Sequence, residues 1–333
     1  MADKKFKIVF TDFDFPSIDI EKGIFNELDC EIFTPQTNDE EKLIEVCKDA
    51  DALLVQYAQI TERIINSMAK CKVISRFGIG VDSIDLKAAK AKGIYVCNVP
   101  DYCIDEVADH SLALILSLGR KIVQFSNSVK SGIWDALKIG RPIYNLKNQI
   151  LGLVGFGKIP QNLSIKAINL FKEILIYDPF ISFEVTKKFN VKAATFYEIL
   201  RYSDFISIHC PLNENTRHMF SLREFQIMKK TAYIINTSRG AIINTPDLYQ
   251  AIANGLIAGA GLDVLEKEPP GMDFELAKLD NVIITPHAGY YSETALEELH
   301  NKWAINVLKV LKGEEPVNVV NKWYISIFKV NWY

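Results

Sequence analysis

The chain is 333 residues long, carries a formal net charge of −3, and contains 49% hydrophobic residues and six cysteines. This length suffices for about two domains, and the composition excludes a disordered or collagen-like chain. Because basic residues are not in excess, the chain lacks the positive electrostatic potential that attracts proteins to nucleic acids or anionic membranes. Because we see no CxxC spacing, no secretory leader and no apolar run of the ~18 residues that cross a bilayer, we expect a soluble, cytoplasmic protein.

The first hundred residues alternate short apolar runs with amphipathic stretches. Strands are expected at 7–10, 31–33, 52–56, 72–76 and 94–98. Helices are expected between them, for example at 39–48 and 83–92. This spacing predicts a compact parallel α/β unit that ends near residue 100.

A strongly apolar helix is expected at 105–123, because hydrophobic residues occupy almost every face of it. We interpret it as an interdomain helix buried between two larger bodies. Residues 131–147 follow without a clear period and carry Trp134 and Tyr144. Since long irregular segments in compact proteins usually make contacts, this segment is predicted to be an arm toward a second subunit.

From residue 150 the alternation of strands and helices resumes. Strands are expected at 151–154, 174–177, 205–209, 233–236, 258–262 and 282–284. A closing helix at 293–311 is expected to cross back toward the first domain. The predicted fold class is therefore α/β, with two Rossmann-like or flavodoxin-like parallel-sheet domains and a cleft between them.

A glycine-rich loop at 151–160 lies between a predicted strand and a predicted helix. Gly155 would permit the tight turn and Gly157 the close approach of a pyrophosphate to the helix N-terminus. Asp178 ends the next strand, where a carboxylate would bind ribose hydroxyls and repel a 2′-phosphate. The third glycine of the motif is replaced by Pro160, which is tolerated in the first turn of a helix. The loop predicts an NAD site.

Three motifs follow predicted strands of the second domain and should meet at one edge of its sheet. They contain Arg239, Glu268 and His287. Histidine suits the exchange of a hydroxyl proton during hydride transfer, and Glu268 could hold its second nitrogen. Arg239 could bind a substrate carboxylate with two N–H groups. A metal site is not expected, because the neighbouring side chains of His209 and Cys210 point to opposite faces of a strand.

These motifs resemble the D-isomer-specific 2-hydroxyacid dehydrogenase family along essentially the whole chain. The resemblance implies that Arg239, Glu268 and His287 are catalytic, with His287 as general acid/base. It also implies a flavodoxin-like substrate domain (1–100 plus 292–333) with an inserted NAD-binding domain (101–291), and a homodimer formed through that domain and its arm. The residues that the family would use to bind NAD are Val107, Gly155, Phe156, Gly157, Lys158, Ile159, Asp178, His209, Cys210, Pro211, Thr216, Thr237, Ser238 and Asp263.

Within this family, the chain is most similar to the C-terminal-binding-protein-like branch. That similarity implies that Arg76 and the backbone N–H groups of Ile79 and Gly80 bind the substrate carboxylate, with Tyr57 beside them. Tyr290 stands where the animal corepressors of the branch have a tryptophan that contacts substrate, which would change the shape of the pocket.

The leading hypothesis is an NAD-dependent enzyme that interconverts a small 2-keto acid and a D-2-hydroxy acid. An alternative is an NAD(H)-sensing, protein-binding scaffold with vestigial activity, as in the corepressors of the same branch. A third is a dehydrogenase for another substrate of the family, such as hydroxypyruvate, phosphoglycerate or formate. The complete Arg239, Glu268 and His287 set favours an active enzyme.

Overall fold

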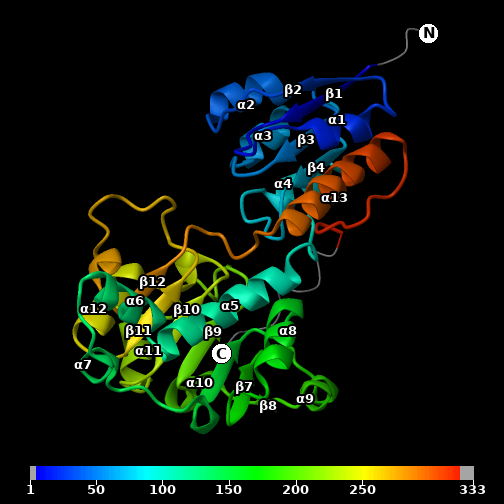
Figure 1. Ribbon diagram of the computed structural model, residues 1–333. Helices are drawn as coiled ribbons and strands as arrows, with labels where there is room; N and C mark the ends of the chain where they lie inside the picture. The colour runs from blue at the N-terminus through cyan, green and yellow to red at the C-terminus, as the bar shows by residue number, and fades with distance from the viewer. Residues whose placement is uncertain (1–4, 323–333) are drawn as a thin grey trace. The chain divides into compact units, whose positions relative to one another are not determined.

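A computed structural model describes residues 5–322, which form two compact units (Figure 1). Unit 1 consists of the described residues up to Tyr102 and from Ser292 onward, and unit 2 is Cys103–Tyr291. Each unit contains one parallel sheet, of five strands in unit 1 and seven in unit 2. The prediction of two parallel-sheet α/β domains is therefore confirmed.

The sheet of unit 1 has the strand order β2-β1-β3-β4-β5, with every neighbouring pair parallel. Its strands are β1 (Phe6–Phe10), β2 (Cys30–Phe33), β3 (Ala52–Val55), β4 (Val73–Arg76) and β5 (Tyr95–Cys97). The helices of this unit are α1 (Asp19–Phe25), α2 (Glu40–Cys47), α3 (Glu62–Ser67), α4 (Leu86–Ala91) and α13 (Glu293–Leu311). This strand order is flavodoxin-like.

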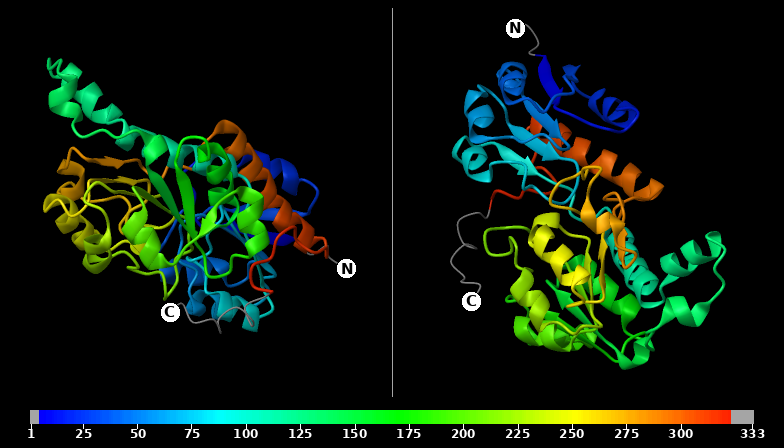
Figure 2. Two further views of the ribbon diagram at one scale, coloured as in Figure 1. Left: turned by 90° about the horizontal axis from the view of Figure 1, so that it is seen from below. Right: turned by 90° about the vertical axis from the view of Figure 1, so that its left-hand side faces the viewer.

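Helix α13 comes from the C-terminal part of the chain and packs against α1, β3 and β4 (Figure 2). Ser292 caps its first turn by accepting a hydrogen bond from the N–H of Ala295. Trp303 of α13 is completely buried against Phe10 of β1.

No helix within residues 5–322 is long and apolar enough to cross a membrane.

The sheet of unit 2 has the strand order β12-β11-β10-β9-β6-β7-β8 and is also parallel. Its strands are β6 (Ile150–Val154), β7 (Glu173–Tyr177), β8 (Lys192–Ala193), β9 (Phe205–Ile208), β10 (Tyr233–Asn236), β11 (Gly259–Leu262) and β12 (Val282–Ile284). The chain reverses its direction of winding between β6 and β9, which are neighbours. Ligands of open α/β sheets bind at the carboxyl ends of the strands at such a switch point.

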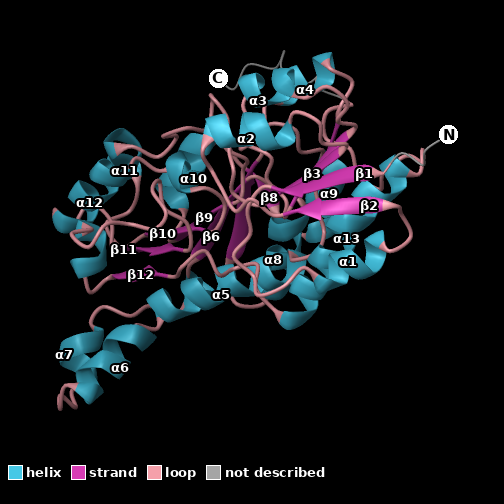
Figure 3. Ribbon diagram, turned by 90° about the horizontal axis from the view of Figure 1, so that it is seen from above, coloured by secondary structure: helices cyan, strands magenta, loops and turns pink. Residues whose placement is uncertain are grey.

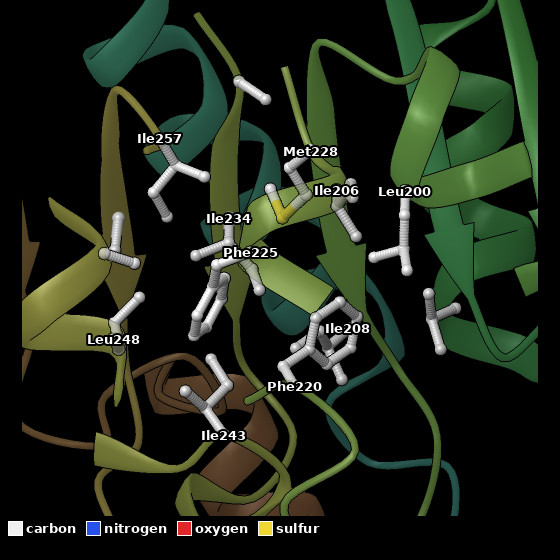
Figure 4. Close-up of a cluster of buried hydrophobic side chains, with 14 of the residues drawn as sticks. Leu200, Ile206, Ile208, Phe220, Phe225, Met228, Ile234, Ile243, Leu248 and Ile257 are labelled. Carbon is white, nitrogen blue, oxygen red and sulfur yellow. The ribbon is translucent and has the colours of Figure 1, made fainter. Parts of the chain in front are cut away.

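Helices cover both faces of this sheet. They are α5 (Ile104–Gly119), α6 (Ile122–Lys130), α7 (Ala136–Gly140), α8 (Lys158–Ala167), α9 (Phe183–Phe189), α10 (Phe196–Tyr202), α11 (Leu222–Ile227) and α12 (Thr245–Ala253). On one face, Leu114 of α5 and Leu163 of α8 lie in one core with strands β6 and β9. On the other, Phe225 of α11 and Leu248 of α12 cover β9 and β10 (Figure 4).

The prediction of one apolar helix at 105–123 is wrong in its extent. Helix α5 ends at Gly119, because Lys121 adopts a left-handed conformation (φ 52°) and the chain then begins α6. Only one face of α5 is buried, and its partners α8, β10 and β11 all belong to unit 2. The segment 131–147, predicted to be irregular, contains α7 and the short 3₁₀ helix η1 (Leu146–Asn148). Helices α6 and α7 project from the sheet of unit 2 (Figure 3).

Candidate active site

The loop after β6 brings Gly155 against the end of β9. Gly155 has a φ of +88°, and a Cβ there would lie 2.8 Å from the backbone nitrogen of Cys210 and 2.9 Å from the carbonyl carbon of His209. A Cβ on Gly157, in contrast, would meet no heavy atom within 4 Å. The fold therefore requires glycine at 155, whereas the space beside Gly157 is open to a ligand that lies close to the backbone.

The first turn of α8 and the end of β7 complete this loop. No side chain caps α8, so its first N–H groups are available to an anion. Asp178 accepts hydrogen bonds from the N–H of Phe156 (2.8 Å) and of Phe180 (2.9 Å). Pro160 is buried in the first turn, where its missing N–H costs no hydrogen bond. These residues fit the pyrophosphate and ribose of a dinucleotide.

The two residues after β9 are neutral. The His209 Nε2 lies 2.8 Å from the Ser207 hydroxyl, and burial lowers the pKa of this imidazole to about 3. Burial also raises the pKa of the Cys210 thiol to about 12. Because the thiolate is the reactive form of cysteine, Cys210 is chemically inert at neutral pH.

The remaining residues predicted to bind NAD lie around the same end of the sheet. The buried Thr216 donates its hydroxyl to the carbonyl of Pro211 (2.6 Å) and thereby holds the loop after β9. Ser238 donates to the carbonyl of Ile208 (3.0 Å). The Thr237 hydroxyl lies 2.9 Å from that of Ser111 in α5, one turn after the buried Val107.

Glu268 and His287 form a hydrogen-bonded pair. The His287 Nδ1 lies 2.7 Å from the Glu268 Oε2, and the Glu268 Oε1 accepts from the N–H of Leu265 (2.7 Å). Burial by itself would raise the pKa of Glu268. The hydrogen bonds from His287 and Leu265 and the positive charge of Arg239 outweigh burial and hold this pKa below its usual value. Glu268 is therefore an anion that orients the imidazole.

A close contact between two loops brings Arg239 near this pair. A Cβ on Gly240 would lie 1.9 Å from the carbonyl carbon of Leu265, so only glycine allows this approach. Arg239 donates from Nη1 to the carbonyl of Ser238 (2.8 Å). Tyr290 lies near His287, with its ring centroid 6.3 Å from that of His287 in an edge-on arrangement. The predicted arginine, carboxylate and histidine are thus near neighbours in unit 2.

Asp263, predicted to lie near the cofactor, is only 3% exposed. Its carboxylate accepts hydrogen bonds from the Thr285 hydroxyl (2.6 Å) and from the N–H groups of Ala288 and Gly289 (2.8 Å each). Burial would raise its pKa, but these bonds and that from His110 outweigh burial and lower it. The side chain therefore holds the turn that carries His287.

Sequence reasoning missed two histidines of this region. His110 lies 2.9 Å from the Thr285 hydroxyl and 3.3 Å from Asp263. His218 lies 2.6 Å from Glu266 and forms a second histidine–glutamate pair. The position of His110 within the predicted helix at 105–123 was the available signal for the first. Nothing in the sequence around His218 indicates its partner.

The predicted substrate residues of unit 1 lie at the carboxyl ends of β3 and β4. Tyr57 is 52% exposed and donates its hydroxyl to Asp14 (2.9 Å). Arg76 ends β4, and its Nη1 would lie 1.8 Å from a Cβ on Gly78, so the guanidinium covers this glycine. Ile79 and Gly80 follow directly, with the Ile79 carbonyl held by the Asn98 amide (2.6 Å).

Together, the sheet order, the glycine loop and the histidine–glutamate pair define an α/β dehydrogenase that binds a dinucleotide. The model of the "D-isomer specific 2-hydroxyacid dehydrogenase, NAD binding domain" matches residues 112–289. The chain belongs to the D-isomer specific 2-hydroxyacid dehydrogenase family, as its sequence predicted.

Known relatives carry the names of different substrates. The chain is 38% identical to a glyoxylate reductase of Thermococcus litoralis, over 84% of this chain and 86% of that protein. It is 40% identical to a D-3-phosphoglycerate dehydrogenase of Methanocaldococcus jannaschii, over 84% of this chain and 53% of that protein. A D-lactate dehydrogenase of Aquifex aeolicus, solved with NAD and lactic acid, is 30% identical with a TM-score of 0.84, over 92% of this chain and 96% of that one.

These similarities confirm the predicted reaction class and cofactor. The chain is an NAD-dependent oxidoreductase of the family that interconverts 2-keto acids and D-2-hydroxy acids.

Proposed function

We propose that this enzyme reduces a small 2-keto acid to the D-2-hydroxy acid, or catalyses the reverse, with His287 as general acid/base. The observation that carries this proposal is the 2.7 Å contact between the His287 Nδ1 and the ionised Glu268, beside Arg239 and in the same unit as the dinucleotide loop. The proposed substrate is a small-molecule acid.

The proton moves at one atom of His287. Since Nδ1 is bound to Glu268, Nε2 gives a proton to the substrate oxygen during reduction and takes it back during oxidation. The negative charge of Glu268 stabilises the imidazolium, as an oriented carboxylate does for other catalytic histidines. Bound nicotinamide supplies or accepts the hydride. Arg239 binds the substrate carboxylate and thereby orients the reacting carbon.

We further propose that substrate is bound in unit 1 by Arg76, Tyr57 and the N–H groups of Ile79 and Gly80. In unit 2, Tyr290 forms an aromatic wall beside His287. These residues support assignment to the C-terminal-binding-protein-like branch of the family. In this assignment, residues 1–100 and 292–333 form the substrate domain, and residues 101–291 the NAD-binding domain; residues 1–4 and 323–333 lie outside the part that the structure describes.

The proposed cofactor preference is for NAD(H) over NADP(H). Asp178 is held by two backbone N–H groups with its carboxylate at the end of β7. A carboxylate there accepts hydrogen bonds from ribose hydroxyls and repels a 2′-phosphate. The other proposed NAD contacts are Val107, Gly155, Phe156, Gly157, Lys158, Ile159, His209, Cys210, Pro211, Thr216, Thr237, Ser238 and Asp263.

We also propose a homodimer in which the arm of one copy, α6 and α7, packs against another copy. Helix α6 has no buried residue, and Trp134 and Leu137 are 89% and 65% exposed. A groove of about 740 Å³ lies between the arm and the amino ends of the strands of unit 2. It is lined by Gln124, Ile133, Tyr144, Phe205, Tyr233 and Ile257.

An exposed apolar arm beside a groove favours a second copy as the occupant. Sedimentation of wild type at twice the monomer mass, and of Trp134→Asp at one, would support this assembly. Sedimentation of wild type as a monomer would refute it.

A cytoplasmic location is proposed from the six cysteines, which are all free thiols.

The reaction is tested by following the loss of NADH absorbance with a panel of 2-keto acids of graded size, including glyoxylate, pyruvate, hydroxypyruvate and phosphohydroxypyruvate. We expect turnover with at least one of them, a D-configured product and a lower rate with NADPH. If NADH binds and no acid is reduced, the enzymatic proposal fails and the NAD(H)-sensing scaffold takes its place.

A further inference from the structure

Three elements of unit 2 meet at the carboxylate of Asp263. The residue follows β11, and its Oδ1 accepts from the Thr285 hydroxyl (2.6 Å), which follows β12. His110 of α5 places its Nε2 2.9 Å from the Thr285 Oγ1 and 3.3 Å from the Asp263 Oδ1. The three side chains therefore form one hydrogen-bonded triad.

The donors of this triad can be assigned by counting hydrogens. A threonine hydroxyl has a single hydrogen, and Thr285 donates it to Asp263. The Thr285 oxygen can therefore only accept from His110. Because both atoms that face the His110 Nε2 are acceptors, we assign the imidazole proton to Nε2. His110 thus donates a hydrogen bond into the Asp263–Thr285 pair.

The triad brackets His287 on both sides. The Asp263 carboxylate accepts from the hydroxyl of Thr285, which precedes His287 in the chain, and from the N–H groups of Ala288 and Gly289, which follow it. The N–H of His287 itself donates to the Asp263 carbonyl (2.8 Å). His287 has a left-handed backbone (φ 53°), a conformation that costs a non-glycine residue roughly 1–2 kcal/mol and persists only where its surroundings enforce it.

We propose that His110 and Thr285 are positioning residues for the general acid/base. They hold the carboxylate of Asp263, which holds the turn at 285–289 and keeps the His287 ring aligned with Glu268. A displacement of about 1 Å at a reacting group is enough to cost roughly 100-fold in rate. The inference rests on the proposed function, because it assigns these residues to the same reaction.

The test compares Thr285→Val, which removes the hydroxyl, with Thr285→Ser, which keeps it. We expect Thr285→Val to lower kcat by about 10- to 100-fold with the dissociation constant of NADH and KM changed less than about threefold, because orientation acts on the chemical step. Thr285→Ser should recover kcat to within about threefold. His110→Leu and His110→Gln form a second pair, in which glutamine keeps an N–H donor.

A matched control exists at the other histidine–glutamate pair. The hydroxyl of Thr245 bonds Glu266, the partner of His218, so Thr245→Val removes a similar hydroxyl from a similar network. We expect its kcat to stay within twofold of wild type. Equal losses in Thr245→Val and Thr285→Val would overturn the proposal.

The inference and the proposed function fail in different ways. Wild-type turnover by His287→Ala would remove the proposed function itself. Loss of turnover in His287→Ala together with unchanged kcat in Thr285→Val and His110→Leu would overturn only the positioning role. If Thr285→Val and His110→Leu both fail to fold, the triad serves stability and the positioning role is overturned as well.

Discussion

Two histidine–glutamate pairs lie in unit 2, and their carboxylates are only two residues apart in the chain. His287 lies 2.7 Å from Glu268, and His218 lies 2.6 Å from Glu266. Both histidines have a left-handed backbone with φ 53°. Their side chains are also similarly exposed, at 43% and 38%. In hydrogen-bond distance, backbone conformation and side-chain exposure, the two pairs are therefore nearly equivalent.

They differ in the ring nitrogen that remains for chemistry. His287 binds its glutamate through Nδ1, which leaves Nε2 at the far end of the ring. His218 uses Nε2 and keeps only Nδ1, which lies next to its own backbone. A general acid must reach the atom that it protonates, so the free nitrogen of His287 is the better placed of the two.

The surroundings of the carboxylates differ as well. The positive charge of Arg239 contributes to lowering the pKa of Glu268. The second oxygen of each glutamate accepts from a backbone N–H, that of Leu265 for Glu268 and that of Thr245 for Glu266, so the difference lies in the charge of Arg239. The comparison teaches that the length of a histidine–carboxylate hydrogen bond does not distinguish the two pairs, whereas the free ring nitrogen and the cation beside the carboxylate do.

The largest effect is expected from replacing the two histidines. His287→Ala removes the group proposed to exchange the proton and should lower kcat/KM by roughly 10²- to 10⁴-fold. His218→Ala should stay within about threefold of wild type, because its pair touches no proposed reacting group. The measurement is the initial rate of NADH oxidation with the best keto acid, alongside the melting temperature. A loss of similar size in both variants would erase the distinction between the pairs.

Sequence alone predicted the parts of this site that depend on strand order. Arg239, Glu268 and His287 each follow a strand, and the carboxyl ends of parallel strands meet at one edge, so their proximity follows from the α/β pattern. The Asp263–His110 contact joins a strand end to a helix more than 150 residues away, which no local pattern indicates. The predicted helix at 105–123 was too long because the chain breaks at Lys121, which is left-handed, directly after Gly119 and Arg120. The break had a signal in Gly119, but the apolar residues Ile122 and Val123 beyond it made the pattern look continuous.

A smaller effect separates the two glycines of the dinucleotide loop. Gly155→Ala should weaken NADH binding at least about tenfold and also lower the melting temperature, because its Cβ meets the backbone of the neighbouring strand end at 2.8–2.9 Å. Gly157→Ala meets no protein atom, so the melting temperature without cofactor should be unchanged. Any loss of NADH affinity in that variant would therefore come from a clash between the new Cβ and the bound cofactor.

Fluorescence titration with NADH and thermal unfolding without it measure the two quantities separately. Wild-type affinity in Gly157→Ala would show that no ligand approaches this backbone, and the pyrophosphate would have to lie elsewhere. If Gly155→Ala kept full stability, the close packing of the loop against the end of β9 would be refuted.

The smallest expected effect concerns a third histidine, His209, whose imidazole is buried at the end of β9. Burial lowers the pKa of His209 to about 3 in the folded chain, whereas an ordinary histidine titrates near 6.5. Between these values the unfolded chain binds one more proton than the folded chain. The free energy of unfolding should therefore fall by about 1.4 kcal/mol for each pH unit below 6.5 through this group alone.

The lowered carboxylates, Asp263 and Glu268, act in the same direction, but only below about pH 4.5, where unfolded carboxyl groups take up protons. Urea unfolding between pH 6.5 and 4.5 therefore isolates the histidine. His209→Gln, which keeps a polar group for the Ser207 hydroxyl, should flatten the pH dependence in this window relative to wild type. If His209→Gln kept the wild-type slope, His209 would have to be protonated in the folded protein, and a neutral imidazole at the end of β9 would be ruled out.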